Sequence, residues 1–242
     1  MEKVVKPYQE EGSKKKQVSN MFDNIAPYYD FLNRFLSLGI DTIWRKKMVT
    51  LLNQKNPKVV LDMATGTGDV ALEIAKQTNA TRIVGVDISP QMLEIGKKKV
   101  KKQGKEQTIE MHVGDSENLS FTDNTFDGAT VAFGVRNYEN LEKGLQEMKR
   151  VLKPGGDLVV LEFSRPTIFP FKQVFNGYFK YILPNIGKMT SKDPKAYEYL
   201  YESVQAFPDG EDFLTIMKKC GYKNTTRKAL TLGICTLYKG EK

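Results

Sequence analysis

The chain contains few cysteines, a single histidine and no long apolar run. Its two cysteines among 242 residues cannot build a disulfide framework, and their spacing does not match a zinc site. No apolar run approaches the ~18–20 residues that span a bilayer. The charged N-terminal residues also lack the apolar stretch of a signal peptide. The sequence therefore argues against a secreted disulfide scaffold and an integral membrane protein, and we expect a cytoplasmic protein without a metal.

Positive charge is in excess, with a formal net charge of +8. Such a chain can meet nucleic acid, an anionic membrane or an anionic ligand. Six lysines lie between Lys97 and Lys105, and the favoured interpretation is a solvated helix end whose lysines complement the helix dipole. No aromatic residues alternate with these lysines, so no nucleic acid is predicted as a partner.

Short apolar runs alternate with amphipathic stretches between residues 56 and 165. The predicted strands cover residues 58–63, 82–87, 109–115, 126–134 and 157–163, and the predicted helices cover 69–77, 89–100 and 140–152. Ser89 and Pro90 suit the N-cap and the first position of the second helix. The alternation, with nearly continuous apolar strands, predicts a parallel α/β sheet covered by helices on both faces.

The two ends of the chain have a different character. Residues 1–55 predict an N-terminal helical cap, and residues 166–205 predict an aromatic-rich insertion without strands. Residues 206–242 predict one helix followed by a pair of strands. Because the sequence shows neither an internal repeat nor a low-complexity linker, we expect a single domain over residues 1–242.

A glycine loop follows the first predicted strand. Asp62 ends the strand, and Gly66, Thr67 and Gly68 precede the next helix. Glycine permits a tight turn and the close approach of a ligand, and the helix N-terminus offers unpaired N–H groups. A plain strand–helix turn has the same pattern, and dinucleotide-binding folds use it too. The loop alone therefore does not identify the ligand.

Acidic residues at three successive strand ends help to identify the ligand. Asp87 closes the second strand, nineteen residues after Gly68, where a carboxylate can accept both ribose hydroxyls. Asp115, followed by Ser116, can read an adenine edge, and Asp62 can hold an ammonium group directly or through water. S-adenosylmethionine contains an amino acid, a ribose and an adenine but no pyrophosphate. It fits these acids better than a dinucleotide, although a NAD-dependent oxidoreductase stays an alternative.

These motifs resemble class I methyltransferases, whose Rossmann-like fold has a seven-stranded, mostly parallel sheet; the last two predicted strands would form its antiparallel pair. Residues 29–45, 133–137 and 150–164 further resemble the ubiquinone/menaquinone biosynthesis C-methyltransferases, and this likeness runs from about residue 15 to the end. The sequence departs from the family pattern at Leu32, where the family usually has Met, and at Asp41, where it usually has His. Leu for Met conserves volume, whereas Asp41 receives no role.

The resemblance implies methyl transfer from S-adenosylmethionine to a ring carbon of a prenylated quinol. It implies demethylmenaquinol as substrate, with 2-polyprenyl-6-methoxy-1,4-benzoquinol or another small molecule as alternatives. A catalytically silent protein that only binds a partner is a third reading. The expected donor-binding residues are Asp62, Gly66, Thr67, Gly68, Asp87, Asp115 and Ser116; the expected substrate-binding residues are Tyr28, Tyr29, Asn33 and Asn137.

Arg136 is the expected catalytic residue. A phenol has a pKa near 10, and removal of its proton makes the ring carbon nucleophilic. Arg136 stays protonated, so it can lower the pKa of the phenol and hold the phenolate while another group takes the proton. A purely structural ion pair is the alternative role. His112 lies within the third predicted strand, and we expect it to be packed and structural.

The substrate class also implies a partner surface. A prenyl tail gains ~0.8 kcal/mol per CH₂ buried in lipid, so the enzyme must reach the membrane. Residues 168–184 combine aromatic and aliphatic side chains with Lys172 and Lys180, and they predict a substrate lid or a transient contact at the inner face of the cell membrane. The apolar side chains include Phe169, Phe171, Phe175, Tyr178, Phe179, Tyr181 and Ile182. A helix packed on the sheet is the alternative, and a homodimer also stays open.

Overall fold

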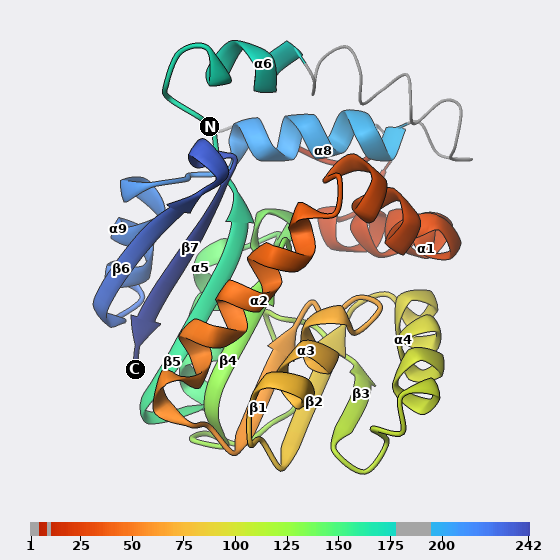
Figure 1. Cartoon of the computed structure of the whole chain (residues 1–242), viewed down its shortest axis with the longest axis vertical. Helices are drawn as coiled ribbons and strands as arrows, with labels where there is room; N and C mark the ends of the chain where they lie inside the picture. The colour runs from red at the N-terminus through yellow and green to blue at the C-terminus, as the bar shows by residue number, and fades with distance from the viewer. Residues whose placement is uncertain (1–4, 9–10, 178–194) are drawn as a thin grey trace.

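The computed structural model describes residues 5–8, 11–177 and 195–242. At its centre is a seven-stranded sheet of order β3-β2-β1-β4-β5-β7-β6 (Figure 1). The strands are Val59–Met63 (β1), Arg82–Asp87 (β2), Ile109–Val113 (β3), Phe126–Ala132 (β4), Leu152–Phe163 (β5), Lys223–Leu230 (β6) and Cys235–Glu241 (β7). The first five strands pair in parallel, and β7 runs antiparallel between β5 and β6. The predicted sheet, with its antiparallel pair, is confirmed.

Helices cover both faces of this sheet. The described helices are Lys14–Leu36 (α1), Ile40–Leu52 (α2), Asp69–Gln77 (α3), Pro90–Lys102 (α4), Leu141–Val151 (α5), Phe171–Gly177 (α6), Lys195–Ala206 (α8) and Glu211–Lys219 (α9), with 3-10 turns at Asn53–Lys55 (η1), Val135–Asn137 (η2) and Thr231–Gly233 (η4). Because side chains alternate along a strand, Val60 packs with α2 and α3, whereas Leu61 and Met63 pack with α5 and α9. The sheet is therefore the middle of three layers.

The helices α1, α6 and α8 lie across the carboxyl ends of the parallel strands (Figure 1). Val18, Met21 and Leu32 of α1 form one apolar cluster with Phe175 of α6 and Tyr199 of α8. This cluster is separate from the two clusters on the sheet faces. The N-terminal cap and the described part of the insertion thus pack on each other above the edge where parallel sheets bind ligands. The domain boundaries at residues 55, 165 and 205 stay a prediction.

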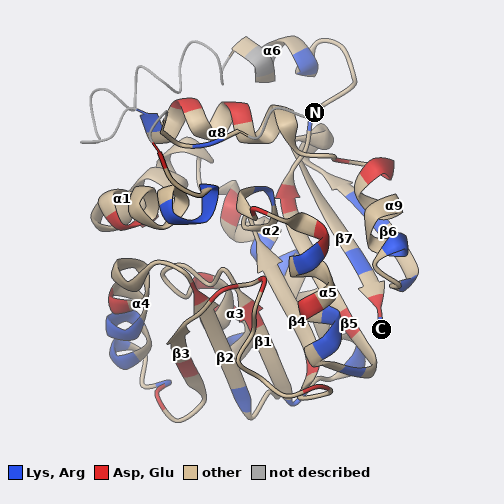
Figure 2. Cartoon of the chain, turned by 180° about the vertical axis from the view of Figure 1, so that it is seen from behind, with Lys and Arg blue, Asp and Glu red and all other residues tan. Residues whose placement is uncertain are grey.

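The lysine run ends α4, as predicted. Lys97, Lys98 and Lys101 are exposed, and Figure 2 shows basic residues in blue along this helix. Lys99 is the exception, since its Nζ donates to Asp30 Oδ2 of α1 at 2.8 Å and to Asp69 at the start of α3. The run is mainly a solvated helix end, and Lys99 links α4 to α1 and α3.

The structure corrects two predictions. His112 is not packed: its side chain is 51% exposed and lies 3.3 Å from Glu110, because β3 is the edge strand of the sheet. The helix ends at Val151 and β5 begins at Leu152, five residues earlier than expected, because Leu152 already pairs with Phe126. Residues 178–184 of the aromatic segment lie outside the described residues. None of the described helices is both long and apolar enough to cross a bilayer.

Candidate active site

Two adjoining cavities lie at the carboxyl ends of the parallel strands. The small cavity measures about 70 Å³, and the large cavity measures about 380 Å³. Phe22 and Tyr29 of α1, together with Phe133 and Asn137 after β4, line both. The two cavities therefore share a wall formed by these side chains.

The glycine loop bounds the small cavity and depends on its glycines. Gly66 and Gly68 have φ of +56° and +80°, in the left-handed region that favours glycine. A Cβ at Gly68 would lie 2.3 Å from the Met111 Cε, so any side chain there would displace Met111. The Gly66 amide donates to Asp87 Oδ2 at 2.8 Å, which joins the loop to the end of β2.

Asp87 lines the small cavity from the end of β2. It is 7% exposed, and its Oδ1 accepts a hydrogen bond from the Ser89 amide at 2.8 Å. Burial raises the pKa of the Asp87 carboxyl to about 6, because a low dielectric disfavours the charged form. Its carboxylate is held in place by backbone donors on both sides.

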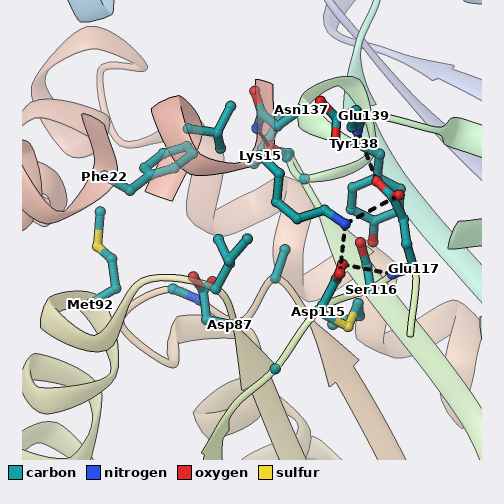
Figure 3. A pocket seen from close by; sticks show the side chains of 18 of the residues that line it. Lys15, Phe22, Asp87, Met92, Asp115, Ser116, Glu117, Asn137, Tyr138 and Glu139 are labelled. Atoms are coloured by element: carbon teal, nitrogen blue, oxygen red, sulfur yellow. Dashed lines mark hydrogen bonds and ion pairs between the residues drawn. The ribbon is translucent and has the colours of Figure 1, made fainter. Parts of the chain in front are cut away.

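Asp115 and Ser116 line the small cavity beyond β3 (Figure 3). Lys15 of α1 reaches down to them, and its Nζ lies 2.6 Å from Asp115 Oδ2 and 3.3 Å from Glu117 Oε2. Asp115 Oδ1 accepts from the Glu117 amide at 2.9 Å. Sequence reasoning missed Lys15 and Glu117, because nothing in the N-terminal residues indicates that α1 lies over the ends of β2 and β3.

Three of the expected donor-binding residues, Asp62, Thr67 and Gly68, line neither cavity. Asp62 is 1% exposed; its carboxylate accepts from Thr65 Oγ1 at 2.6 Å and Thr130 Oγ1 at 2.7 Å. Burial raises the pKa of the Asp62 carboxyl to about 6. Thr67 Oγ1 donates to Asp30 at 2.5 Å. Neither these two residues nor Gly68 line either cavity, and the contacts of all three shape the loop.

The large cavity is mostly apolar. Aromatic and aliphatic side chains of α1, α2, α6 and α8 and of the ends of β4 and β5 line it, among them Phe22, Leu32, Trp44, Phe133, Phe163, Phe171, Phe175, Tyr199 and Leu200. Of the expected substrate-binding residues, Tyr29, Asn33 and Asn137 line it. Tyr28 is 43% exposed and lines neither cavity.

Arg136 lines the large cavity and also forms a buried ion pair. It lies on η2, directly after β4, and its Nη1 donates to Glu162 Oε1 at 2.8 Å and to the Phe133 carbonyl. The side chains of Arg136 and Glu162 are 8% and 0% exposed. The guanidinium lies 5.6 Å from the centre of the Phe163 ring. The structure therefore contains both the cavity position and the ion pair that the sequence left as alternatives.

Glu162 is the counterion that sequence reasoning missed. Its Oε1 also accepts from the Phe163 amide at 2.9 Å, and Oε2 accepts from the Arg136 amide at 3.4 Å. Burial raises the pKa of Glu162, and the Arg136 charge opposes that shift. Glu162 lies in the Leu-Glu-Phe-Ser segment at the end of β5, which belongs to the family resemblance. Nothing in the sequence indicated that it pairs with Arg136.

Lys14 fastens the start of α1 to the turn that carries Arg136. Its Nζ donates to the Arg136 and Tyr138 carbonyls at 3.0 and 2.9 Å, and its amide donates to Glu139 Oε1 at 2.8 Å. Burial lowers the pKa of the Lys14 ammonium to about 8. The cap thus holds the backbone of η2 in place.

The small cavity suits S-adenosylmethionine better than a dinucleotide. Its charged wall includes Asp87, Asp115 and Glu117, which can accept hydrogen bonds from hydroxyls and amines, and Lys15. These three carboxylates outnumber the one ammonium, and they would repel a pyrophosphate. Across residues 5–8, 11–177 and 195–242, no group of three or more His, Cys, Asp or Glu side chains could hold a metal ion.

Comparisons of sequence agree with this chemistry. A model of the ubiE/COQ5 methyltransferase family matches residues 10–242. A demethylmenaquinone methyltransferase of Bacteroides fragilis is 48% identical over 98% of this chain and 97% of its own length. A ubiquinone/menaquinone biosynthesis C-methyltransferase of Geotalea daltonii is 48% identical over 95% of this chain and 97% of its own.

Solved structures show the same fold. A SAM-dependent methyltransferase of Thermotoga maritima has a TM-score of 0.67 at 18% identity, over 93% of this chain and 99% of that one. A phosphoethanolamine N-methyltransferase of Haemonchus contortus, in complex with S-adenosylmethionine, has a TM-score of 0.60 at 16% identity, over 88% of this chain and 59% of that one. The chain is an S-adenosylmethionine-dependent methyltransferase and belongs to the ubiE/COQ5 methyltransferase family.

Proposed function

We propose that this enzyme methylates a ring carbon of demethylmenaquinol, in menaquinone biosynthesis. The observation that carries the proposal is an apolar cavity of about 380 Å³ that adjoins the small cavity and has Arg136 in its wall. A naphthoquinol ring with the first part of its prenyl tail is a ligand of that size and polarity. The names of the relatives from Bacteroides fragilis and Porphyromonas gingivalis support the same substrate.

In the small cavity the chain orients the methyl donor. We propose that Asp87 accepts the ribose hydroxyls and that Asp115, with the backbone at Ser116, binds the adenine. Gly66 lets the backbone approach the donor closely. When bound, S-adenosylmethionine supplies an electrophilic methyl group on a sulfonium sulfur. Because Phe22 and Tyr29 line both cavities, they can align the two ligands and exclude water.

In the large cavity Arg136 activates the ring. Its guanidinium stabilises the negative charge of the ionised quinol oxygen, which spreads into the ring and makes the carbon nucleophilic. With the donor bound, that carbon would bond to its methyl group as the carbon–sulfur bond breaks and leaves its electron pair on sulfur. The methylated carbon would then lose its proton to water, and the ring would become aromatic again. Asn33 and Asn137 line the same cavity and can position the quinol through their amides.

Mass analysis of a methylation assay tests the substrate. The enzyme is incubated anaerobically with isotope-labelled donor and, separately, with reduced demethylmenaquinone and with 2-polyprenyl-6-methoxy-1,4-benzoquinol. We expect the label in the naphthoquinol ring at a much higher rate. If the protein binds the donor but transfers no label to demethylmenaquinol, the proposal is refuted. If the benzoquinol is labelled faster, the benzoquinol is the substrate in place of demethylmenaquinol.

Donor affinity is expected to rise with pH up to about 7. The pKa of Asp87 in the ligand-free protein is about 6, and ribose hydroxyls bind the charged carboxylate. At pH 5 about one tenth of such a group is ionised, so donor binding should be ~10-fold weaker at pH 5 than at pH 8. Calorimetry over this range measures the effect. Asp87→Asn should bind ~10- to 100-fold more weakly at pH 8 and lose the pH dependence.

The matched control is Asp123→Asn, which changes an exposed aspartate outside both cavities. It should keep the wild-type affinity and its pH dependence. Equal donor affinity of folded Asp87→Asn and wild type at pH 8 would remove Asp87 from the donor site.

We also propose that the enzyme meets the membrane transiently through the mouth of the large cavity. Leu38 and Phe171 line that cavity and are 85% and 38% exposed. Phe31 and Phe35 of α1 and Phe169 before α6 are likewise exposed, so exposed apolar side chains lie on or beside helices that line the cavity. Exposed Lys46, Lys47 and Lys172 lie on the same helices, α2 and α6, that line the cavity. Exposed apolar and basic side chains of this kind suit a substrate whose tail stays in lipid.

Co-sedimentation with anionic vesicles tests this contact. Each lysine near an anionic surface adds ~1 kcal/mol, so binding should be measurable at low salt and weaken as salt rises. The double variant Phe31→Ser, Leu38→Ser should bind less, whereas Val113→Ser, at an exposed position on the edge strand β3, should not. If the wild type does not bind anionic vesicles at low salt, the proposed membrane contact is refuted.

A further inference from the structure

Buried polar atoms without a partner gather at the wall of the large cavity. Within the described part of the chain, Arg136 Nε, Asn137 Oδ1 and the Tyr199 hydroxyl are buried and make no hydrogen bond. All three residues line the large cavity. Folded proteins leave few buried polar groups unpaired, because each one loses its hydrogen bond to water. Three of them in side chains that line one apolar cavity point to a bound state in which these side chains turn toward a ligand whose polar atoms complete them.

Tyr199 is the one residue of these three that was not among the expected site residues. It lies on α8, is 2% exposed and comes from a segment more than sixty residues after Arg136 in the sequence. The helix α8 contacts η2, the turn that carries Arg136 and Asn137. The charges of Arg136 and Glu162 both act on the Tyr199 hydroxyl. Tyr199 thus belongs with the catalytic turn in space, although no sequence motif joins them.

The chemistry of the three atoms matches a half-ionised hydroquinone. Such a ring carries one oxygen that only accepts hydrogen bonds and one hydroxyl that can donate. Arg136 Nε–H and the Tyr199 hydroxyl are donors, and Asn137 Oδ1 is an acceptor. Burial raises the pKa of Tyr199 well above its ordinary value, so the substrate phenol ionises first and the tyrosine stays a donor.

We propose that Tyr199 is a substrate-binding residue whose hydroxyl donates a hydrogen bond to the same ionised ring oxygen that Arg136 stabilises. The inference rests on the proposed quinol methylation and adds a second donor to its oxyanion site. Two donors hold the oxygen at a fixed point relative to the sulfonium, so Tyr199 contributes both to binding the quinol and to directing its carbon. A ligand that carries ether oxygens in place of hydroxyls cannot ionise and gains less from this site.

Tyr199→Phe removes only the hydroxyl and tests the proposal. Because that hydroxyl has no partner in the ligand-free structure, its loss should leave the melting temperature unchanged or raise it; a structural hydroxyl would lower it. With quinol and donor, kcat/KM should fall ~10- to 100-fold, and the pH at which the rate rises should move upward. The affinity for the donor should not change.

The control is Tyr201→Phe on the same helix, at a half-buried position that lines neither cavity. It should keep wild-type kcat/KM and the wild-type pH profile. Binding of 1,4-dihydroxynaphthalene and of 1,4-dimethoxynaphthalene is measured by anaerobic calorimetry, with donor product present. The wild type should prefer the diol by ~10-fold or more, and Tyr199→Phe should lose most of that preference.

The outcomes separate the two proposals. If wild-type enzyme transfers no methyl group to any quinol, the proposed function fails whatever Tyr199 does. If the wild type methylates the quinol and Tyr199→Phe retains its rate, its pH profile and its preference for the diol, the role of Tyr199 is overturned alone. A lowered melting temperature with an unchanged pH profile would make Tyr199 a structural residue.

Discussion

Replacing Arg136 with alanine is expected to lower kcat for quinol methylation by ~10²–10³-fold and to leave donor affinity nearly unchanged. The reason is that Arg136 stabilises charge that develops only as the ring becomes a nucleophile. Arg136→Lys should recover part of the rate, because lysine keeps the charge but loses the planar pair of donors. Single-turnover kinetics with saturating donor and quinol measure the chemical step directly.

The pH profile separates this role from simple positioning. In Arg136→Ala the pKa of the bound phenol should move up toward its solution value near 10, so the rate should climb as pH approaches that value. In the wild type the rise should occur at lower pH. A variant that loses rate with an unaltered pH profile would show that Arg136 positions the ring or supports the fold instead.

Removing Glu162 alone is expected to lower the free energy of unfolding by ~3–5 kcal/mol. Its carboxylate is 0% exposed and pairs with Arg136, which is 8% exposed, so Glu162→Leu leaves a buried cation without its counterion. Arg136→Met should destabilise the protein by a similar amount for the converse reason. Urea unfolding, monitored by circular dichroism, gives both values.

The double variant Arg136→Met, Glu162→Leu completes the cycle. Since an apolar pair replaces a buried ion pair at little cost, it should be more stable than either single variant, while its methylation rate stays as low as that of Arg136→Met. Stability would then be regained while the methylation rate is not, as expected if Arg136 has a catalytic role besides its ion pair. Additive losses of stability would mean that the two side chains act independently.

The strand–helix alternation was sufficient to predict the sheet, because parallel strands buried on both faces leave a local apolar pattern. Asp87 and Asp115 could be placed in the small cavity because each lies at the carboxyl end of a predicted strand: Asp87 ends β2, and Asp115 follows β3 by two residues. The orientation of the side chains of Asp62 and Thr67, at the glycine loop, was harder to predict. Sequence fixes their position along the chain, but whether a side chain faces the ligand or the loop behind it depends on partners such as Thr130 and Asp30.

The remaining errors and omissions concern contacts between distant segments. His112 looked buried because its strand is apolar, and strand order, which no local pattern encodes, placed it at the edge of the sheet. Lys15 and Tyr199 meet the site only because α1 and α8 fold over the carboxyl ends of the strands, and Glu162, at the end of β5, pairs with Arg136 because η2 lies beside that strand. Their positions follow from tertiary packing and not from any periodicity.

The helix α1 has a kinetic consequence. Lys15, Phe22 and Tyr29 come from this one helix, and between them they line both cavities and pair with Asp115 and Glu117. A small cavity of about 70 Å³ is too small for S-adenosylmethionine, so we expect α1 to move whenever the donor enters or leaves. We expect the temperature dependence of donor release, measured apart from methyl transfer, to report the movement of that helix.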